Sequence, residues 1–549
     1  GDKASARQVA VANGVPVAPG YDGPDGDETL VREAKRIGFP VMVKARGGGG
    51  GRGMRVVERA EDLPEALAAA RREAEAAFGD PGLLLEKLIR RAHHVEVQIL
   101  GDVHANLVHL GERDCSVQRR RQKLIEETPS PVVDDALREE LTAAALRLAK
   151  AVGYTNAGTV EFLVGEPGAD GRRPFYFLEV NPRLQVEHPV TEAVTGLDLV
   201  ELQVCIAAGE ELPFEQEEIL FDGHAIELRV NAEDPWHDFA PSPGRIERLD
   251  VPSTGLFGRA DLGYGPGDTV PGQYDSLIGK LVFQGEDREE AIESALADAG
   301  GTTLRGPSTN LSLLAAILES DTFQEGEAAV DWLAEGLPEL LAAATPPEEV
   351  VAAAAIGWAR SRAQRGSPFA SGPFMCWIDG PGGVRRVAVT PESGGRVTAC
   401  VGRDANGDAP GAEARRLEGR LFDIPDGCEV RWESAGYRVG VTEDGEIAVV
   451  PAEGGLRTWL VRVAAPPPLP ARARADADGS SIVTAPLAGT IAAVRVAEGD
   501  SVEAGDLLLT LEAMKMEHRV VANGAGAVRR LAVGAGDVVR EGDLLVELG

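Results

Sequence analysis

The chain has 549 residues, more than a single hydrophobic core accommodates, so the sequence predicts several domains. Its 55 basic and 88 acidic residues give a net charge of −33, which disfavours nucleic acid and anionic membranes as partners. Five cysteines lack any paired or metal-type spacing, so we expect a cytoplasmic protein. We see neither a signal peptide nor an apolar run of membrane-spanning length.

Residues 1 to about 210 alternate helical and extended patterns. A short predicted strand over residues 41–44 ends at Lys44 and leads into five glycines, and a second extended run follows at residues 54–57. One interpretation of the glycines is a flexible linker. The other, which the flanking strands favour, is a mobile loop whose N–H groups close over phosphates. The run is not a P-loop, because no Gly-Lys-Ser/Thr follows it.

Other local patterns predict regular elements further along this region. They are an amphipathic helix over residues 61–78, a buried strand over 83–89 and a half-buried strand over 93–99. His93 and His94 would point to opposite faces of the last strand, so we exclude a zinc site there. Asp134 is expected to cap a helix that Gly153 ends.

Two extended runs, residues 159–164 and 175–180, are joined by a turn-rich loop. If they pair antiparallel about the centre of that loop, Glu161 lies opposite Glu179. Like charges directly opposite each other destabilise a sheet, and a bridging divalent cation would remove the conflict. Carboxylate and phosphate oxygens suit Mg²⁺ in particular. The alternative is a shifted register that leaves the two glutamates apart at the surface.

The next segment, residues 181–192, contains too many polar groups for a simple connector. Two prolines keep it out of regular helix, so we expect Arg183 and Glu187 to face a solvent-lined cleft beside the predicted metal site. The alternative is an ordinary loop. Its position directly after a predicted metal ligand favours a functional site.

The C-terminal part contains an internal repeat, in which residues 489–512 recur as residues 526–549. Each copy reads as short strands broken by Gly-Asp turn signals, which predicts a small two-fold-like β sandwich. Lys515 lies between the two copies, where a hairpin would present its amine for covalent modification. The alternative is a plain surface lysine.

The region between these two parts is less informative. Residues 342–363 form an alanine-rich helical stretch, and short alternating runs from residue 382 to residue 463 suggest a small β-barrel. The proline-rich and charged residues 464–480 predict a semi-rigid to flexible linker. Such a linker would give the C-terminal module reach.

Several motifs, in order along the chain, carry a resemblance to a known family. The first part resembles the ATP-grasp core of biotin carboxylase in Lys44 with its glycine run, Glu86-Lys87, Cys115 to Lys123 and Asn181 to Glu192. The resemblance extends through the family's C-terminal subdomain in Gly223 to Pro235 and Tyr274 to Leu281. Ala513 to Met516 inside the duplicated unit resembles the attachment motif of a biotin carrier, and residues 330–463 resemble, by position, the subunit-contact region of acyl-CoA carboxylase α-subunits.

The resemblance implies a multidomain α+β chain. Its expected parts are an ATP-grasp domain at 1–210 with a lid at about 18–90, a biotin carboxylase C-terminal subdomain at 211–325, a helical and β-barrel-like subunit-contact region at 330–463, a linker at 464–480 and a flattened biotinyl (lipoyl-like) β-barrel at 481–549. The implied activity is ATP- and bicarbonate-dependent carboxylation of biotin held covalently on Lys515. ATP and Mg²⁺ (or Mn²⁺) are the further cofactors.

The resemblance also implies roles for individual residues. Those assigned to ATP are Lys3, Lys44, Gly50, Gly51, Glu86, His94 and Gln118. Those assigned to Mg²⁺ are Glu161, Glu179 and Asn181. Bicarbonate would be held by Lys123, Arg183 and Val186. Glu187 would be the base that deprotonates bicarbonate, and Arg229 would stabilise the enolate-like ureido oxygen of biotin.

The sequence departs from the family pattern in two places. Arg121 stands where relatives carry a histidine that contacts the ribose, which bears on nucleotide affinity. Relatives also carry a complete N-terminal α/β domain before the motif that begins here at Gly1. We therefore expect a truncated chain, or a first domain on another chain, and a protein that accepts biotin well but carboxylates it poorly.

The expected partners are a carboxyltransferase β-subunit and a biotin protein ligase, in a hetero-oligomer without nucleic acid or membrane. A non-catalytic biotin carrier with a vestigial carboxylase region is the alternative function. This alternative is disfavoured because the chain retains the residues Lys44, Glu161, Glu179, Arg183, Glu187 and Arg229. Pyruvate carboxylase is disfavoured, because no carboxyltransferase-sized region lies between residue 330 and the C-terminal module. The sequence does not specify which acyl-CoA is carboxylated.

Overall fold

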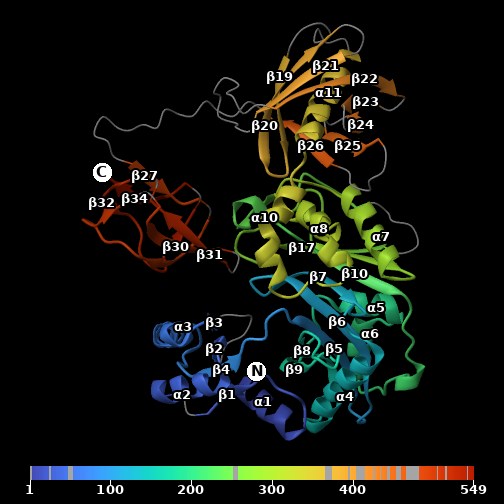
Figure 1. Cartoon of the computed structure of the whole chain (residues 1–549), viewed down its shortest axis with the longest axis vertical. Helices are drawn as coiled ribbons and strands as arrows, with labels where there is room; N and C mark the ends of the chain where they lie inside the picture. Colours follow the sequence, from blue (N-terminus) through green and yellow to red (C-terminus); the bar gives the residue numbers. More distant parts are fainter. Residues whose placement is uncertain are drawn as a thin grey trace.

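The structure of the chain is a computed structural model (Figure 1). It describes residues 3–23, 26–46, 54–251, 258–364, 374–392, 396–402, 415–424, 427–432, 435–441, 446–452, 459–464, 481–486, 488–503, 505–513, 516–522, 524–540 and 542–549. These residues form a small N-terminal sheet, a large central sheet with its covering helices, a β-barrel and a C-terminal pair of sheets.

The small sheet lies in the segment that the sequence predicts as the lid. Its strands follow the order β1-β4-β2-β3, with bounds Gly20–Tyr21, Leu83–Lys87, Val41–Ala45 and Met54–Val57. All neighbouring pairs are antiparallel. Two helices, α2 (Asp27–Ile37) and α3 (Leu63–Phe78), pack on the sheet. Leu30, Leu63 and Leu85 are fully buried between the layers, so this unit has a core of its own.

The central sheet is antiparallel, and its strands follow the order β15-β17-β10-β7-β6-β5-β8-β9. In chain order they are β5 (His93–Gly101), β6 (Leu107–Arg119), β7 (Gln122–Thr128), β8 (Asn156–Val164), β9 (Phe175–Asn181), β10 (His224–Asn231), β15 (Gly258–Leu262) and β17 (Leu277–Gly285). Because β10 pairs with β7, one sheet runs across the domain boundary that the sequence places at residue 210.

Helices cover the central sheet. They are α1 (Lys3–Ala12), α4 (Asp135–Ala151), α5 (His188–Thr195), α6 (Leu199–Ala207), α7 (Arg288–Gly301), α8 (Leu311–Leu318), α9 (Asp321–Gln324) and α10 (Trp332–Ala344). Asp134 caps α4 as predicted, since its carboxylate accepts the Leu137 N–H at 2.8 Å. The largest core cluster joins Ile226 and Leu228 of β10 to Leu313 of α8.

Three short two-stranded sheets complete this region. They are β11 (Glu233–Asp234) with β12 (Ala240–Pro241), β13 (Gly244–Arg245) with β16 (Thr269–Val270), and β14 (Arg248–Asp250) with β18 (Thr303–Arg305).

A closed barrel follows, as the sequence predicts. Its strands are β19 (Phe374–Gly380), β20 (Gly383–Pro391), β21 (Arg396–Gly402), β22 (Arg415–Ile424), β23 (Gly427–Trp432), β24 (Gly436–Val441), β25 (Glu446–Pro451) and β26 (Trp459–Ala464). Helix α11 (Glu348–Gln364) packs against all of them and shares their core (Figure 1). Its alanines at 352–355 are fully buried, because only small side chains leave room for a helix among the strands.

The helical stretch predicted at residues 342–363 is two helices rather than one. Helix α10 ends at Ala344 and α11 begins at Glu348, because Pro346 and Pro347 have no N–H to donate to a continuing helix. The segment Trp332–Arg360 has the length and apolar composition of a membrane-spanning helix, contrary to our expectation of no such run. Within it, the most apolar window of 18 residues is 61% buried inside the protein, as in the core helices of soluble proteins.

The C-terminal module consists of two sheets, with strand orders β27-β34-β32-β29 and β31-β30-β28-β33. In chain order the strands are β27 (Ser481–Thr484), β28 (Gly489–Val494), β29 (Ser501–Val502), β30 (Leu507–Ala513), β31 (Met516–Val521), β32 (Gly526–Leu531), β33 (Val538–Val539) and β34 (Leu544–Leu548). Leu508 and Leu545, equivalent positions of the repeat, are both fully buried in its core.

The repeat is visible in the turns of this module. Gly499, Gly505, Gly536 and Gly542 all adopt positive φ angles, between 84° and 97°. Each is followed by an aspartate that accepts the N–H of the residue three positions before it, at 2.7–2.8 Å. The predicted Gly-Asp turns are therefore confirmed.

Candidate active site

The hairpin of β8 and β9 sets two glutamates directly opposite each other. Glu161 and Glu179 are register partners, so the register predicted from the sequence is confirmed. The side-chain amide of Asn181 donates to Oε1 of Glu161 at 2.6 Å. Glu161 is buried and Glu179 is half-buried. Two of the three residues assigned to Mg²⁺ are thus in direct contact, and the third lies across the strand pair.

His94 approaches the same glutamate, with its Nε2 atom 3.0 Å from Oε2 of Glu161. Burial alone would raise the pKa of Glu161, but His94, Lys123 and a hydrogen bond from Gln185 lower it to about 2. Burial lowers the pKa of His94, whereas Glu161 raises it, and the net effect is an increase. The imidazole of His93 lies 3.3 Å from Oγ of Ser116 and 3.5 Å from Oδ2 of Asp114, so the two adjacent imidazoles have different carboxylate partners.

This donor set fits a hard divalent cation. Glu161 is ionised, and Glu161, Glu179 and Asn181 together offer carboxylate and amide oxygens on adjacent strands. Ligand atoms of His94, Glu96 and Glu161 also lie within 4.8 Å of one another. Mg²⁺ bound here would neutralise charge on phosphate oxygens, which is the main demand of phosphoryl transfer.

Glu187 is buried, with 2% of its surface exposed, which corrects the prediction that it faces a solvent-lined cleft. It lies between two cations, because Lys123 contacts Oε1 and Nη2 of Arg229 lies 2.8 Å from Oε2. Burial by itself would raise the pKa of Glu187, but Lys123, Arg229 and Arg113 hold it far below its usual range. The two cationic partners replace the water that an ionised carboxylate would otherwise bind, so the Glu187 side chain can be buried.

Arg229 links this base to a further carboxylate. Its Nε donates to Oε1 of Glu126 on β7 at 2.6 Å, and its Nη2 lies 2.5 Å from that oxygen and 2.8 Å from Oε2 of Glu187. Burial would lower the pKa of Arg229, but Glu126, Glu187 and Glu227 raise it overall. The guanidinium is therefore a permanent cation, held at a fixed position between β7 and the start of α5.

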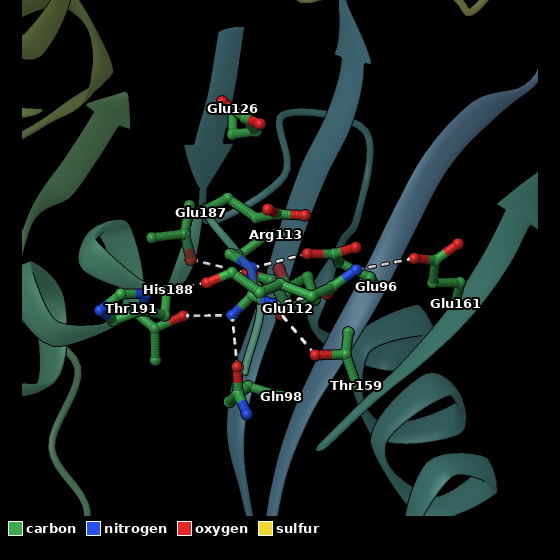
Figure 2. A network of polar contacts seen from close by, with 12 residues as sticks. Glu96, Gln98, Glu112, Arg113, Glu126, Thr159, Glu161, Glu187, His188 and Thr191 are labelled. Carbon is green, nitrogen blue, oxygen red and sulfur yellow. Dashed lines mark hydrogen bonds and ion pairs between the residues drawn. The ribbon is translucent and has the colours of Figure 1, made fainter. Parts of the chain in front are cut away.

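Arg113 is a fully buried cation that ties the site together (Figure 2). Its donors reach Oε1 of Glu96 at 2.7 Å and Oε1 of Gln98 at 2.8 Å. Further hydrogen bonds reach Thr191 at 3.0 Å, Thr159 at 3.3 Å and Gln185 at 3.3 Å. One side chain thereby joins β5, β8, the 182–187 segment and α5.

The residues assigned to ATP fall into two groups. Lys44 and Glu86 form an ion pair within the small sheet. His94 and Gln118 approach to 3.4 Å within the central sheet. The guanidinium of Arg121 lies 3.7 Å from the sulfur of Met42, so it contacts a strand of the small sheet. The side chain of Lys3, and Gly50, Gly51 and Lys515 as a whole, lie outside the described residues.

The residues assigned to bicarbonate differ in exposure. Lys123 is largely buried, and its Nζ lies 2.7 Å from Oε2 of Glu96. Arg183 is exposed and donates only to the Leu184 carbonyl among the contacts described, at 3.1 Å. The Val186 carbonyl accepts a hydrogen bond from Lys280 at 2.8 Å.

Comparison with known families accounts for most of the chain. Residues 2–215 match the model of the carbamoyl-phosphate synthase L chain, ATP-binding domain, and residues 227–335 match that of the biotin carboxylase C-terminal domain. Residues 481–548 match the model of biotin-requiring enzymes.

Among curated relatives, the mitochondrial methylcrotonoyl-CoA carboxylase subunit alpha of Rattus norvegicus is 38% identical over 540 residues, which are 95% of this chain and 74% of the relative. The chain belongs to the biotin carboxylase family. Biotin carboxylase 2 of Bacillus subtilis is 48% identical over 338 residues, covering 61% of this chain and 74% of that protein. The chain is therefore an ATP-dependent biotin carboxylase joined to a biotin carrier domain.

Solved biotin carboxylases have the same ATP-grasp fold. The biotin carboxylase domain of Hydrogenobacter thermophilus 2-oxoglutarate carboxylase, in complex with MgADP and bicarbonate, is 43% identical, with a TM-score of 0.59 over 63% of this chain and 75% of that one. A biotin carboxylase from Campylobacter jejuni gives 44% identity and a TM-score of 0.58 over 61% of this chain and 73% of that one. The predicted fold and the predicted cofactors, covalent biotin, ATP and Mg²⁺, agree with this family.

Sequence reasoning missed Glu96, Arg113 and Glu126 as members of the biotin carboxylase site. The local pattern did not mark Glu96, because residues 93–99 alternate as a half-buried strand would, whereas the structure buries all of β5. Arg113 lies in β6 among several other polar residues, so nothing local distinguished it. Charged side chains are rarely buried without partners, and both of these find theirs on other strands. The roles of the individual site residues stay predictions.

Proposed function

We propose that this chain carboxylates biotin carried on Lys515, using ATP and bicarbonate, as the α-subunit of an acyl-CoA carboxylase. The observation that supports the proposal best is the similarity to a methylcrotonoyl-CoA carboxylase α-subunit over 95% of the chain, carboxylase and carrier regions together. The acyl-CoA would be bound by a carboxyltransferase β-subunit, and a biotin protein ligase would modify Lys515. We place the complex in the cytoplasm.

In the proposed reaction, Lys123 and Arg183 attract bicarbonate, and Glu187 removes its proton. A bicarbonate oxygen then forms a bond to the γ-phosphorus of ATP while the bond to ADP breaks, which activates the carboxyl group for transfer. Because Lys123 and Arg229 both contact Glu187, they hold its carboxylate where the arriving proton must go. Bicarbonate has to displace one of these contacts before Glu187 accepts the proton.

Arg229 would act in the transfer to biotin. Carboxyl transfer would break the bond between the carboxyl carbon and the phosphate group, and the released phosphate would take the proton of the ureido nitrogen. The negative charge that develops on the ureido oxygen would be stabilised by the fixed guanidinium in the manner of an oxyanion hole. Its fixed position comes from Glu126 on one side and Glu187 on the other. The biotin on Lys515 would then carry the carboxyl group to the β-subunit.

The test is ATP hydrolysis that depends on both bicarbonate and free biotin, measured on the chain with and without its C-terminal biotin. Biotin-stimulated hydrolysis, abolished in Glu187→Gln, supports the proposal. Biotinylation of Lys515 without any such hydrolysis, both in this chain and in a version that carries a family-type N-terminal domain, would favour the non-catalytic carrier instead.

A further inference from the structure

Two glutamates that have no role in the proposed reaction lie opposite each other next to Arg229. Glu126 of β7 and Glu227 of β10 are register partners on adjacent antiparallel strands. Both are fully buried. Like charges directly opposite each other destabilise a strand pair, and burying a charge without a partner costs more still. Two ionised carboxylates are therefore a poor description of this pair.

The hydrogen-bond partners of the two side chains also argue against two ionised carboxylates. Among the described residues, both carboxylate oxygens of Glu227 and Oε2 of Glu126 are buried without a hydrogen-bond partner. Only Oε1 of Glu126 is bonded, to Arg229. If both carboxylates were ionised, these three oxygen atoms could only accept hydrogen bonds, and no donor would be available to them. If one carboxyl group is protonated, its O–H can donate to the other carboxylate.

The nearby cations do not compensate two negative charges at this pair, because each of them also binds another group. The nearest cation, Arg229, also binds Glu187. Lys123 of β7 binds Glu96 and Glu187, and Lys280 of β17 binds the Val186 carbonyl and lies 3.6 Å from Asp261. Other titratable groups on the neighbouring elements include Cys115 and Arg113 of β6, Glu127 of β7 with its partners His224 and Arg288, His188 and Glu192 of α5, and Arg259 of β15, which pairs with Glu192 and Asp261. The pKa of Glu227 is raised well above its usual value, mainly by burial and next by the nearby carboxylate of Glu126.

We propose that Glu126 and Glu227 share one proton, and that the resulting single negative charge positions Arg229. The inference rests on the proposed role of Arg229 in stabilising the biotin oxygen. With the proton on Glu227, the single charge lies on Glu126, whose Oε1 accepts from Nε of Arg229 at 2.6 Å and lies 2.5 Å from Nη2. The same Nη2 then bridges to Oε2 of Glu187 at 2.8 Å. A second negative charge on Glu227 would compete for the guanidinium and draw it away from Glu187.

The shared proton has a direct spectroscopic test on the full chain. The carbonyl stretch of a protonated carboxyl group is separate from the bands of a carboxylate. The infrared difference spectrum between the wild type and Glu227→Gln, at mildly alkaline pH, should contain a carboxylic-acid band from the wild type. A difference spectrum that contains only carboxylate bands would overturn the proposal. This readout needs no enzymatic activity, so it is decisive even if the proposed carboxylation is not observed.

The positioning role is tested by comparing substitutions at the two glutamates. Glu227→Ala leaves Glu126 without its neutral partner and should lower kcat for biotin carboxylation by about tenfold or more, whereas Glu227→Gln, which resembles a protonated carboxyl group, should recover most of it. Glu126→Gln removes the charge that binds Arg229 and should lower kcat by about 10²-fold.

The pH profile completes this test. Wild-type activity should fall at alkaline pH as the pair loses its proton, and Glu227→Gln should lack that fall. Two results would overturn the positioning role. One is a kcat that Glu227→Gln lowers as much as Glu227→Ala does. The other is a loss of activity at alkaline pH that is the same in Glu227→Gln as in the wild type.

Discussion

Glu187 illustrates how a general base is held before its substrate arrives. Its carboxylate is buried between Lys123 and Arg229, and these cations keep it ionised. An ionised carboxylate paired with two cations is a weak base, because protonation would break both ion pairs. Substrate binding that loosens one pair therefore raises the basicity of Glu187 at the moment when it is needed.

Glu187→Gln and Arg183→Ala should have different effects on stability. Both should abolish most carboxylation, and loss of the positioned base should cost about 10²–10⁴ in rate. Glu187→Gln removes one of the carboxylate partners of two buried cations, which keep Glu96 and Glu126, so it should destabilise the fold by about 1–3 kcal/mol. Arg183 is exposed, so Arg183→Ala should change stability by less than about 0.5 kcal/mol. Thermal unfolding of the two variants, beside bicarbonate-dependent ATP hydrolysis, checks this. Equal unfolding temperatures would contradict the buried position of Glu187.

The pair of Glu161 and His94 should make stability depend on pH in both directions. The pKa of Glu161 is lowered from 4.5 to about 2, so its contribution is present above pH 4.5 and is lost as the pH falls. The pKa of His94 is raised above 6.5, so its contribution is full below that pH and is lost as the pH rises through the folded value. Denaturant unfolding of the wild type and Glu161→Gln should converge in acid. A constant difference between the two proteins at every pH would argue against the pair.

Within the β8–β9 hairpin, two glutamates lie directly opposite each other, and a bound divalent cation would relieve the repulsion between them. Glu161 and Glu179 are opposite like charges, so Mg²⁺ should raise the unfolding temperature of the wild type. Glu179→Gln should stabilise the metal-free protein by up to about 1 kcal/mol and remove most of the gain from Mg²⁺. The matched control is Glu217→Gln, at an exposed position away from the hairpin. An Mg²⁺ effect that survives in Glu179→Gln would exclude Glu179 as a ligand.

Helix α11 packs so closely into the barrel that a normally favourable substitution should be harmful. Replacing a helical glycine with alanine usually stabilises a helix by about 1 kcal/mol. A Cβ atom at Gly357 would lie 2.3 Å from Cγ1 of Val439 on β24, so Gly357→Ala should instead destabilise the protein by about 1–3 kcal/mol. Adding Val439→Ala should restore part of the loss. Thermal unfolding of the single and double variants measures this. A stabilised Gly357→Ala would mean that helix and barrel are less closely packed.

At the scale of the whole molecule, the C-terminal module has its own core and its own repeated turns. Modification of Lys515 should therefore not require an active carboxylase site. Treatment with a biotin ligase should add one biotin per chain, detected by intact mass, to the wild type and to Glu187→Gln alike. Lys515→Arg should remain unmodified. A second adduct, or an adduct on Lys515→Arg, would refute the assignment of the site.

Features that depend on neighbouring residues could be predicted from the sequence alone. The Gly-Asp turns of the repeat, the cap at Asp134 and the opposition of Glu161 and Glu179 follow from local backbone preferences and from the length of one loop. The tertiary structure decided which charged groups meet inside the protein. It buried Glu187 between Lys123 and Arg229, and it set Glu126 opposite Glu227 although the two are far apart in the chain. A side chain's burial and partners depend on strands that pair over long distances in sequence, and no local pattern encodes that pairing.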